Sequence, residues 1–364
     1  MQLLKAPKKI LLVVASLLLF NSAHAQNTIT TAVPFLLISP DSRANGMGEA
    51  NVAIADNASA IYWNPAGLGF QKGADVNFTH ADWLPAFNAD LFYDYLSAKY
   101  YMRGYGTFGL GITYLDLGEV NYRDEDNRDL GIFKSYEFAL TGAYGVRIHP
   151  YLSVGASIRY IYSALTQKNI TVGSEEGSGV GSTISFDLAT MWRPVFAGYL
   201  ADRLSFGLNI SNIGPKMTYI DEAQADPLPT NLKVGFALRA YDDDYNKLTI
   251  AADFNKLLVT RNDDNTTDGV FEAMFSSWSN GLESFTFGVG AEYWYGHPAL
   301  FALRTGYFYE DPNYGGRKYL TFGAGVRYSS FGVDFSYLSA IEENHPLDGT
   351  VRFSVLLNFP KAGI

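Results

Sequence analysis

Few residues of this sequence stand at spacings that support catalysis or metal binding. The 364 residues include 5 His and no Cys, which excludes thiol catalysis, disulfides and Cys-ligated metals. The histidines are His24, His80, His149, His297 and His345. Three of them precede Pro, as is typical of turns, no two stand at metal-ligand spacing, and no Gly-x-Ser-x-Gly motif is present. We therefore predict that the protein is not an enzyme and holds no cofactor and no metal.

Acidic residues cluster at 242–244 and again at Asp263, Asp264 and Asp268. Calcium binding is conceivable at either place, but no further ligand follows the first cluster at the spacing of a calcium loop. Solvated connections are the favoured interpretation of both clusters. The formal net charge is −10, and a nucleic-acid-binding protein needs a basic surface, so we expect no nucleic-acid partner.

Two groups of apolar residues fall in connections that are otherwise polar. Between 271 and 278, three aromatic residues and Met274 recur at positions i, i+3, i+4 and i+7, which predicts one face of a short helix. The second group lies at 83–87. These side chains either sit at the headgroup level of a membrane or form a surface that docks a protein, and both interpretations stay open. The candidate partner-binding residues are Trp83, Leu84, Phe87, Phe271, Phe275 and Trp278.

The polarity of the side chains alternates with period two in the segments that carry these connections. From Phe285 to Tyr295, rings and aliphatic side chains at odd positions alternate with mostly small or polar residues at even positions. Successive side chains of a strand point to opposite faces, so each such strand has one apolar and one polar face. The alternation predicts fourteen strands, at 74–80, 91–102, 105–116, 135–147, 151–165, 180–192, 203–212, 231–241, 246–258, 283–295, 299–309, 318–328, 331–338 and 350–359.

A soluble β-sandwich also alternates, but two features favour a membrane barrel. Aromatic residues stand near the ends of the apolar faces, as in the girdles of outer-membrane barrels. The connections after even-numbered strands are mostly short, as at 103–104 and 329–330, whereas those after odd-numbered strands are mostly long and polar. We therefore predict an all-β fold, a 14-stranded antiparallel transmembrane β-barrel with extracellular long loops and both barrel ends in the periplasm.

The N-terminus has the three parts of a secretory signal peptide. Lys5, Lys8 and Lys9 precede an apolar run at 10–20, and Ala23-His24-Ala25 fits a signal-peptidase site. The apolar run is too short to span a bilayer, which disfavours the alternative of an anchoring helix. We predict a signal peptide at 1–25, with cleavage between Ala25 and Gln26 and delivery to the outer membrane.

Residues 26–73 do not alternate and are dense in Gly, Asn, Pro and Asp, which mark turns. A fourteen-stranded barrel encloses a lumen wide enough to need a plug. The sequence therefore predicts a plug at 26–73 and the barrel at 74–364. In the turn at 64–67, Asn64 can bond the local backbone, Pro65 fixes its φ and Gly67 admits a positive φ.

The same segment carries a family resemblance. The turn at 64–68, preceded by Gly46-Met47-Gly48, resembles the N-terminal hatch of the FadL superfamily, whose members are fourteen-stranded outer-membrane barrels. Residues 35–43 and Trp63-Asn64-Pro65 are further similar to the PorV (LptO) family of the type IX secretion system of Bacteroidota, with the related PorQ family as an alternative. The residues that match the hatch motif are Asp41, Ser42, Arg43, Gly46, Gly48, Asn64, Pro65, Ala66 and Gly67.

The resemblance implies a function in protein secretion. Members of such a family bind the C-terminal signal domain of secreted cargo and pass it from the translocon channel to a cell-surface attachment complex that contains the sortase-like PorU. The implied partners are therefore cargo, translocon, attachment complex and outer-membrane lipids. The alternative is a FadL-like transporter of hydrophobic small molecules. Charged residues expected on the inner wall disfavour a channel for hydrophobic ligands, because such a channel needs an apolar lining. These residues are Arg159, Glu292, Arg327, Asp334 and Arg352.

Overall fold

The computed structural model describes most of the chain. The described residues are 31–87, 89–123, 128–166, 170–172, 175–177, 179–196, 198–219, 225–262, 266–279 and 284–362. The predicted signal peptide, its cleavage position and the acidic residues Asp263 and Asp264 lie outside them.

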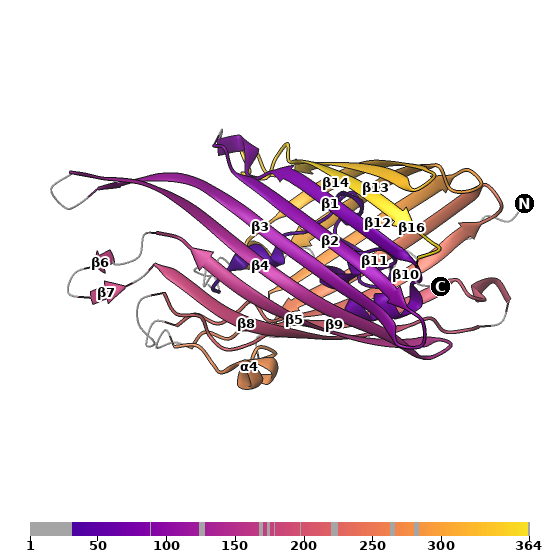
Figure 1. The fold of residues 1–364 in the computed structure, drawn as a ribbon, viewed down its shortest axis with the longest axis horizontal. Coiled ribbons are helices and arrows are strands. Elements are labelled where there is room, and N and C mark those ends of the chain that lie inside the picture. The colour runs from indigo at the N-terminus through magenta and orange to yellow at the C-terminus, as the bar shows by residue number, and fades with distance from the viewer. Residues whose placement is uncertain are drawn as a thin grey trace, which may run out of the picture.

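Within the described ranges, fourteen antiparallel strands close into a barrel in which β1 pairs with β16 (Figure 1). The strands are β1 (Ala74–Asp82), β2 (Phe92–Met102), β3 (Gly106–Arg123), β4 (Asp129–His149), β5 (Leu152–Ala164), β8 (Val180–Trp192), β9 (Leu204–Ile213), β10 (Asn231–Asp242), β11 (Asn246–Leu257), β12 (Phe285–Tyr295), β13 (Phe301–Glu310), β14 (Lys318–Tyr328), β15 (Phe331–Ala340) and β16 (Val351–Phe359). The prediction of a 14-stranded antiparallel barrel is confirmed, and all strands except β3 and β4 begin and end within two residues of the predicted positions.

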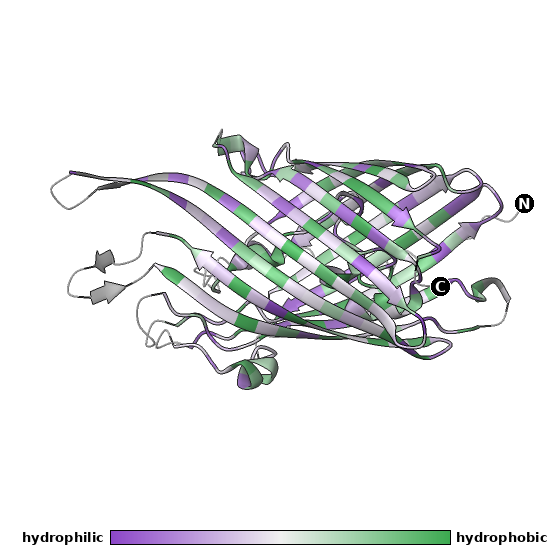
Figure 2. Ribbon diagram, viewed as in Figure 1, coloured by the Kyte–Doolittle hydropathy of each residue, from purple (hydrophilic) through white to green (hydrophobic). Residues whose placement is uncertain are grey.

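The two faces of each strand differ in polarity as the alternation predicts. On β11, Asp253 is buried inside the barrel whereas the side chain of Phe254 points outward and is 51% exposed. Figure 2 shows the same change of hydropathy from residue to residue along the strands. An apolar outer face suits a lipid environment, and a polar inner face suits a filled lumen. The charged residues predicted for the inner wall do line it.

The connections differ in length at the two ends of the barrel. Short turns join β2 to β3, β4 to β5, β10 to β11, β12 to β13 and β14 to β15, at the end where β1 begins and β16 ends. The 3-10 turn η4 (Gly198–Leu200) lies in a longer connection at this end. The opposite end carries the other connections, with η3 (Pro85–Phe87), the hairpin of β6 (Ile170–Val172) and β7 (Glu175–Gly177), α4 (Val270–Ser276) and η6 (Pro312–Tyr314). In outer-membrane barrels the long connections are extracellular, so the end that carries α4 is assigned as the extracellular end.

Strands β3 and β4 run well beyond the predicted limits and project from the extracellular end (Figure 1). After an irregularity between Asp116 and Glu119, their pairing resumes at Glu119 opposite Lys134. The Lys134 ammonium also contacts the buried Asp116 carboxylate at 2.7 Å. Since this projection is polar and has no clear alternation, the sequence predicts a solvated loop there, and the cross-strand pairing overrides that expectation.

Residues 31–73, here called the N-terminal segment, lie inside the barrel. They contain η1 (Pro34–Leu37), α2 (Ser42–Asn45), α3 (Ala60–Trp63) and η2 (Pro65–Phe70). Ser354 on β16, Asp253 on β11 and Ser153 on β5 all hydrogen-bond to this segment, although these strands stand far apart around the barrel. Only a segment in the lumen can reach all three, and Figure 1 shows its short helices within the barrel. Every helix among the described residues is too short or too polar to cross a bilayer.

Candidate functional site

Helix α2 is fixed at its start by Asp41. The Asp41 carboxylate accepts hydrogen bonds from the Ala44 backbone N–H at 2.9 Å and from the Trp63 indole N–H at 2.8 Å. The first bond is the usual cap of a helix N-terminus, and the second ties α2 to α3. Burial of Asp41 raises the pKa of its carboxyl above the ordinary value, against the effect of these two bonds.

Arg43 of α2 connects the N-terminal segment to the barrel wall through buried charges. Its guanidinium donates two hydrogen bonds of 2.7 Å to the Glu292 carboxylate on β12 and a third to Asp56. Glu292 also accepts from Arg304 at 2.7 Å, and Arg304 continues to Asp334 at 2.8 Å. A buried ion pair repays the loss of hydration only when its charges are well hydrogen-bonded, and this chain of alternating charges meets that condition.

Two glycines of the sequence motif allow the N-terminal segment to touch the wall by its backbone. Gly48 has φ +63°, and a Cβ there would lie 2.6 Å from the Tyr307 carbonyl oxygen. Its N–H donates to Thr321 Oγ1 at 2.9 Å. Gly46 stands against Gly323 of β14, where a Cβ would approach the Gly323 Cα to 3.1 Å. Side chains at these positions would push the segment away from the wall.

The turn at 64–67 is held from both sides. Asn64 accepts from the Ala66 N–H at 3.0 Å and donates to the carbonyl oxygens of Val52 at 3.0 Å and Thr190 at 3.2 Å. Pro65 opens η2, where a fixed φ is favourable, and the Ala66 carbonyl accepts from the wall residue Ser153 at 2.6 Å. Gly67 does not use the positive φ that a glycine admits. Gly67 is needed for space instead, because a Cβ would lie 2.2 Å from the Ala55 carbonyl oxygen.

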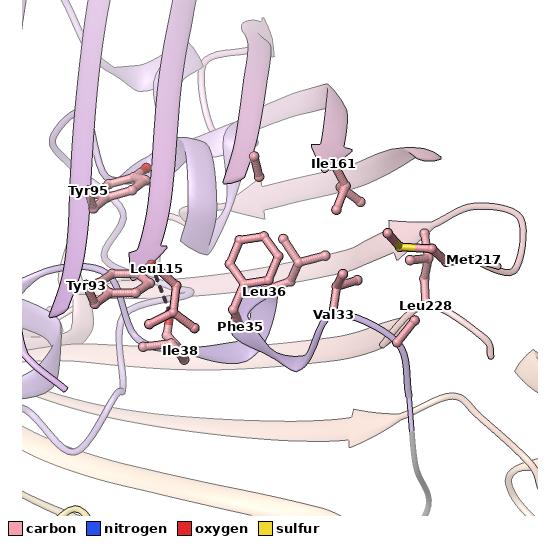
Figure 3. Packing of buried hydrophobic residues seen from close by; sticks show 12 residues of the cluster. Val33, Phe35, Leu36, Ile38, Tyr93, Tyr95, Leu115, Ile161, Met217 and Leu228 are labelled. Carbon is pink, nitrogen blue, oxygen red and sulfur yellow. Dashed lines mark hydrogen bonds between the residues drawn. The ribbon is translucent and has the colours of Figure 1, made fainter. Parts of the chain in front are cut away.

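An apolar cavity of about 870 Å³, here called the mouth cavity, opens at the extracellular end. Its apolar lining includes Val33, Phe35, Trp83, Leu115, Leu117 and Leu347, and its charged lining includes Glu137, Asp226 and Arg317. Figure 3 shows the floor, where side chains of η1 pack among strand residues and against the connection after β9. The Tyr93 hydroxyl donates to the Ile38 carbonyl oxygen at 3.5 Å. The arrangement can receive apolar side chains or a small apolar molecule from outside the cell.

The predicted partner-binding residues do not form one surface. Trp83 and Leu84 turn into the mouth cavity and pack on buried residues, while Phe87 on η3 is 60% exposed. Phe271 and Phe275 are 72% and 81% exposed on α4, which lies outside the barrel outline in Figure 1. The predicted short helix at 271–278 is therefore present as α4, but it is separate from the mouth cavity.

The sequence prediction missed most of the mouth cavity. Val33, the β3 residues Leu115 and Leu117, and Leu347 belong to three separate stretches of the chain, and only the fold brings them together. The run Phe35-Leu36-Leu37-Ile38 was a usable signal, since four apolar residues in a row are unusual within a turn-rich segment.

The barrel is similar in fold to solved structures of two toluene transporters and a FadL homologue. The toluene transporter TbuX of Ralstonia pickettii is 16% identical with a TM-score of 0.51, and the match covers 88% of this chain and 98% of TbuX. The toluene transporter TodX of Pseudomonas putida is 11% identical with a TM-score of 0.53, covering 92% and 100%. A Pseudomonas aeruginosa FadL homologue is 11% identical with a TM-score of 0.50, covering 89% and 98%. At such identities the likeness concerns the fold alone. No curated protein sequence matches significantly.

Fold and lumen together define an outer-membrane β-barrel of the FadL type. The family model of the type IX secretion system protein PorV matches residues 21–264. The chain belongs to the PorV family, and is thus an outer-membrane component of the type IX secretion system.

Proposed function

We propose that this protein binds the C-terminal signal domain of secreted cargo at its mouth cavity and passes the cargo from the translocon channel to the PorU-type attachment complex. The observation that supports this proposal most directly is the apolar cavity of about 870 Å³ at the extracellular end of a filled barrel. Membership of the PorV family supports a role in this secretion system.

The filled lumen argues for binding at the surface rather than passage through the barrel. The N-terminal segment occupies the lumen and is bonded to strands on all sides. A folded cargo domain therefore contacts a surface of the barrel, and the extracellular end with the projection of β3 and β4 is the surface that carries the cavity. We propose that residues 26–73 act as a permanent plug, with the hatch motif as its attachment to the wall; residues 26–30 lie outside the described part of the chain.

The mouth cavity suits anchoring side chains of a protein partner. Burial of apolar surface contributes about 25 cal/mol per Å², so one or two large side chains inserted here would supply several kcal/mol. Trp83 and Leu84 line this cavity, and Phe87 follows them along the chain on η3, so the first two predicted contact residues are in place to meet a partner there. Aromatic residues at the centre of an interface commonly dominate its affinity.

The test is a binding measurement between the purified barrel and the C-terminal signal domain of a secreted protein from the same organism. Trp83→Ser and, separately, Leu117→Gln should each weaken binding by about 30-fold, which corresponds to about 2 kcal/mol for a hot-spot residue. The matched control is Phe271→Ser with Phe275→Ser on α4, which lies apart from the cavity and should leave binding unchanged. Normal binding by both cavity variants, with folding verified by heat-modifiable migration, would place the cargo site elsewhere.

The second candidate is transport of hydrophobic small molecules, because the structurally similar TbuX and TodX are toluene transporters. The apolar lining of the mouth cavity favours it. Inside the barrel, however, the buried charges of Arg43, Glu292 and Arg304 join the N-terminal segment to the wall, and such charges disfavour a path for a hydrophobic molecule there. Toluene uptake into cells that carry only this barrel, above that of cells without it, would support the second candidate over the first.

A further inference from the structure

The connection that contains α4 folds back onto the outer wall of the barrel. On β11, Lys256 stands opposite Phe285 of β12, and Phe254 stands opposite Phe287. These four side chains share one face, and it is the outer one, since Asp253, the residue before Phe254, points inward to bond the N-terminal segment. Phe254 is 51% exposed on this face, whereas Lys256 is only 1% exposed. Something must therefore cover Lys256 on the lipid side of the wall.

The cover is Trp278, which follows α4. The Trp278 ring packs edge-on against Phe285 with 6.1 Å between ring centroids, and the Lys256 ammonium lies 5.4 Å from the Trp278 ring. Lys256 also donates to Ser284 Oγ at 3.2 Å. These contacts attach the end of the α4 connection to the outer surface of β11 and β12, so α4 stands beside the barrel.

The rest of the connection is held by polar contacts on its inner side. Thr260 and Ser276 share a hydrogen bond of 2.8 Å, and Ser276 also bonds Asp268. The Asn262 amide donates to Asp268 at 2.9 Å. Ala273 and Ser277, four residues apart, are buried on the helix face that points toward this network. The opposite face of α4 is therefore fixed in direction and carries Phe271 and Phe275, at 72% and 81% exposure.

We propose that α4 is an interfacial helix that inserts Phe271 and Phe275 into the outer leaflet of the outer membrane. Its aromatic face continues the apolar outer wall through Trp278 and Phe285, and Figure 1 places it outside the barrel outline rather than beyond the strand ends. Aromatic side chains at the boundary of the hydrocarbon are stabilised there, and a short helix with one apolar face lies in the plane of the interface. The occupant of this surface is lipid, and the protein gains an anchor that fixes its depth and rotation beside its partners.

The experiment uses the absence of Cys from the chain. Phe275→Cys, labelled with an environment-sensitive nitrobenzoxadiazole fluorophore, is placed in phosphatidylcholine nanodiscs, and quenching by doxyl groups on the acyl chains is compared with quenching by aqueous iodide. Leu110→Cys, 52% exposed on the outer wall, is the lipid control, and Phe87→Cys, 60% exposed on η3, is the water control. Heat-modifiable migration verifies folding, and Phe271→Cys serves as a second reporter on the same face.

We expect the labels at 275 and 271 to behave like the label at 110, with strong doxyl quenching and iodide quenching several-fold weaker than at 87. Labels that match position 87 would overturn the proposal. If such labels become shielded only when the cargo signal domain is added, α4 is a protein-docking surface instead. The readout does not depend on cargo binding at the mouth cavity, so this proposal and the proposed function can fail separately.

Discussion

Replacing Arg43 by Met removes the side chain that ties the N-terminal segment to β12. Three charge-assisted hydrogen bonds disappear, two to Glu292 and one to Asp56, and the Arg43 side chain that makes them is 12% exposed. Loss of one partner of a buried ion pair costs about 3–5 kcal/mol, because the other charge is left behind. Glu292 keeps its bond of 2.7 Å to Arg304, so the lower figure applies.

A loss of about 3 kcal/mol raises the population with a detached segment by about 100-fold, if the barrel itself stays folded. Hydrogen exchange followed by mass spectrometry measures this population through the amides of residues 41–56. Those amides should exchange about 100-fold faster in Arg43→Met, while the strand amides keep their rates. Arg43→Lys should fall between the two, since Lys keeps the charge but not the paired geometry.

Arg239→Met is the matched control. Arg239 pairs with Asp242 at 2.8 Å, but its side chain is half exposed, so its removal should change exchange rates little. Wild-type exchange at 41–56 in Arg43→Met would refute the reasoning, and would mean that packing and backbone contacts hold the segment without the charges.

Three further predictions concern the barrel and its contents. Gly48→Ala should lower the free energy of unfolding in urea by about 2–4 kcal/mol, because position 48 has a positive φ and no room for a Cβ. The control Gly104→Ala, at φ +81° with open space around it, should lower this free energy by about 1 kcal/mol. Deletion of 35–70 should leave an inserted barrel with raised permeability in liposome-swelling assays, and unchanged permeability would show that the segment does not block the lumen. The protein should fractionate with the outer membrane and migrate faster on gels before heating than after, since every ladder bond of a closed barrel is internal, and recovery in the soluble periplasm would contradict this.

The barrel was predictable because its determinants are local. Alternation along each strand and the length of each connection are properties of consecutive residues, so they can be counted in the sequence. The projection of β3 and β4 was not predictable from consecutive residues. It depends on pairing between two polar stretches, which places Glu119 opposite Lys134.

The candidate site was predictable only in part. The hatch motif named residues that do attach the N-terminal segment to the wall, although the reason for Gly67 is crowding by the Ala55 carbonyl rather than its own φ. The apolar residues of the loops were found by their composition, but composition cannot tell that Trp83 turns inward while Phe275 points away from the barrel. The mouth cavity depends on residues from separate connections, so it follows only from their arrangement in space.

The bonds between the N-terminal segment and strands all around the barrel constrain the order of assembly. Ser42 bonds Ser354 of the last strand, and Ser354 also bonds Thr79 of the first, so the place where the ring closes includes the segment itself. A segment that is synthesised before every strand can serve as a template around which later strands are added. Pairing of β1 with β16 then closes the barrel and forms the last contacts to the N-terminal segment in the same step. Replacement of Ser42 or Ser354 by Ala should therefore slow the closure of the barrel.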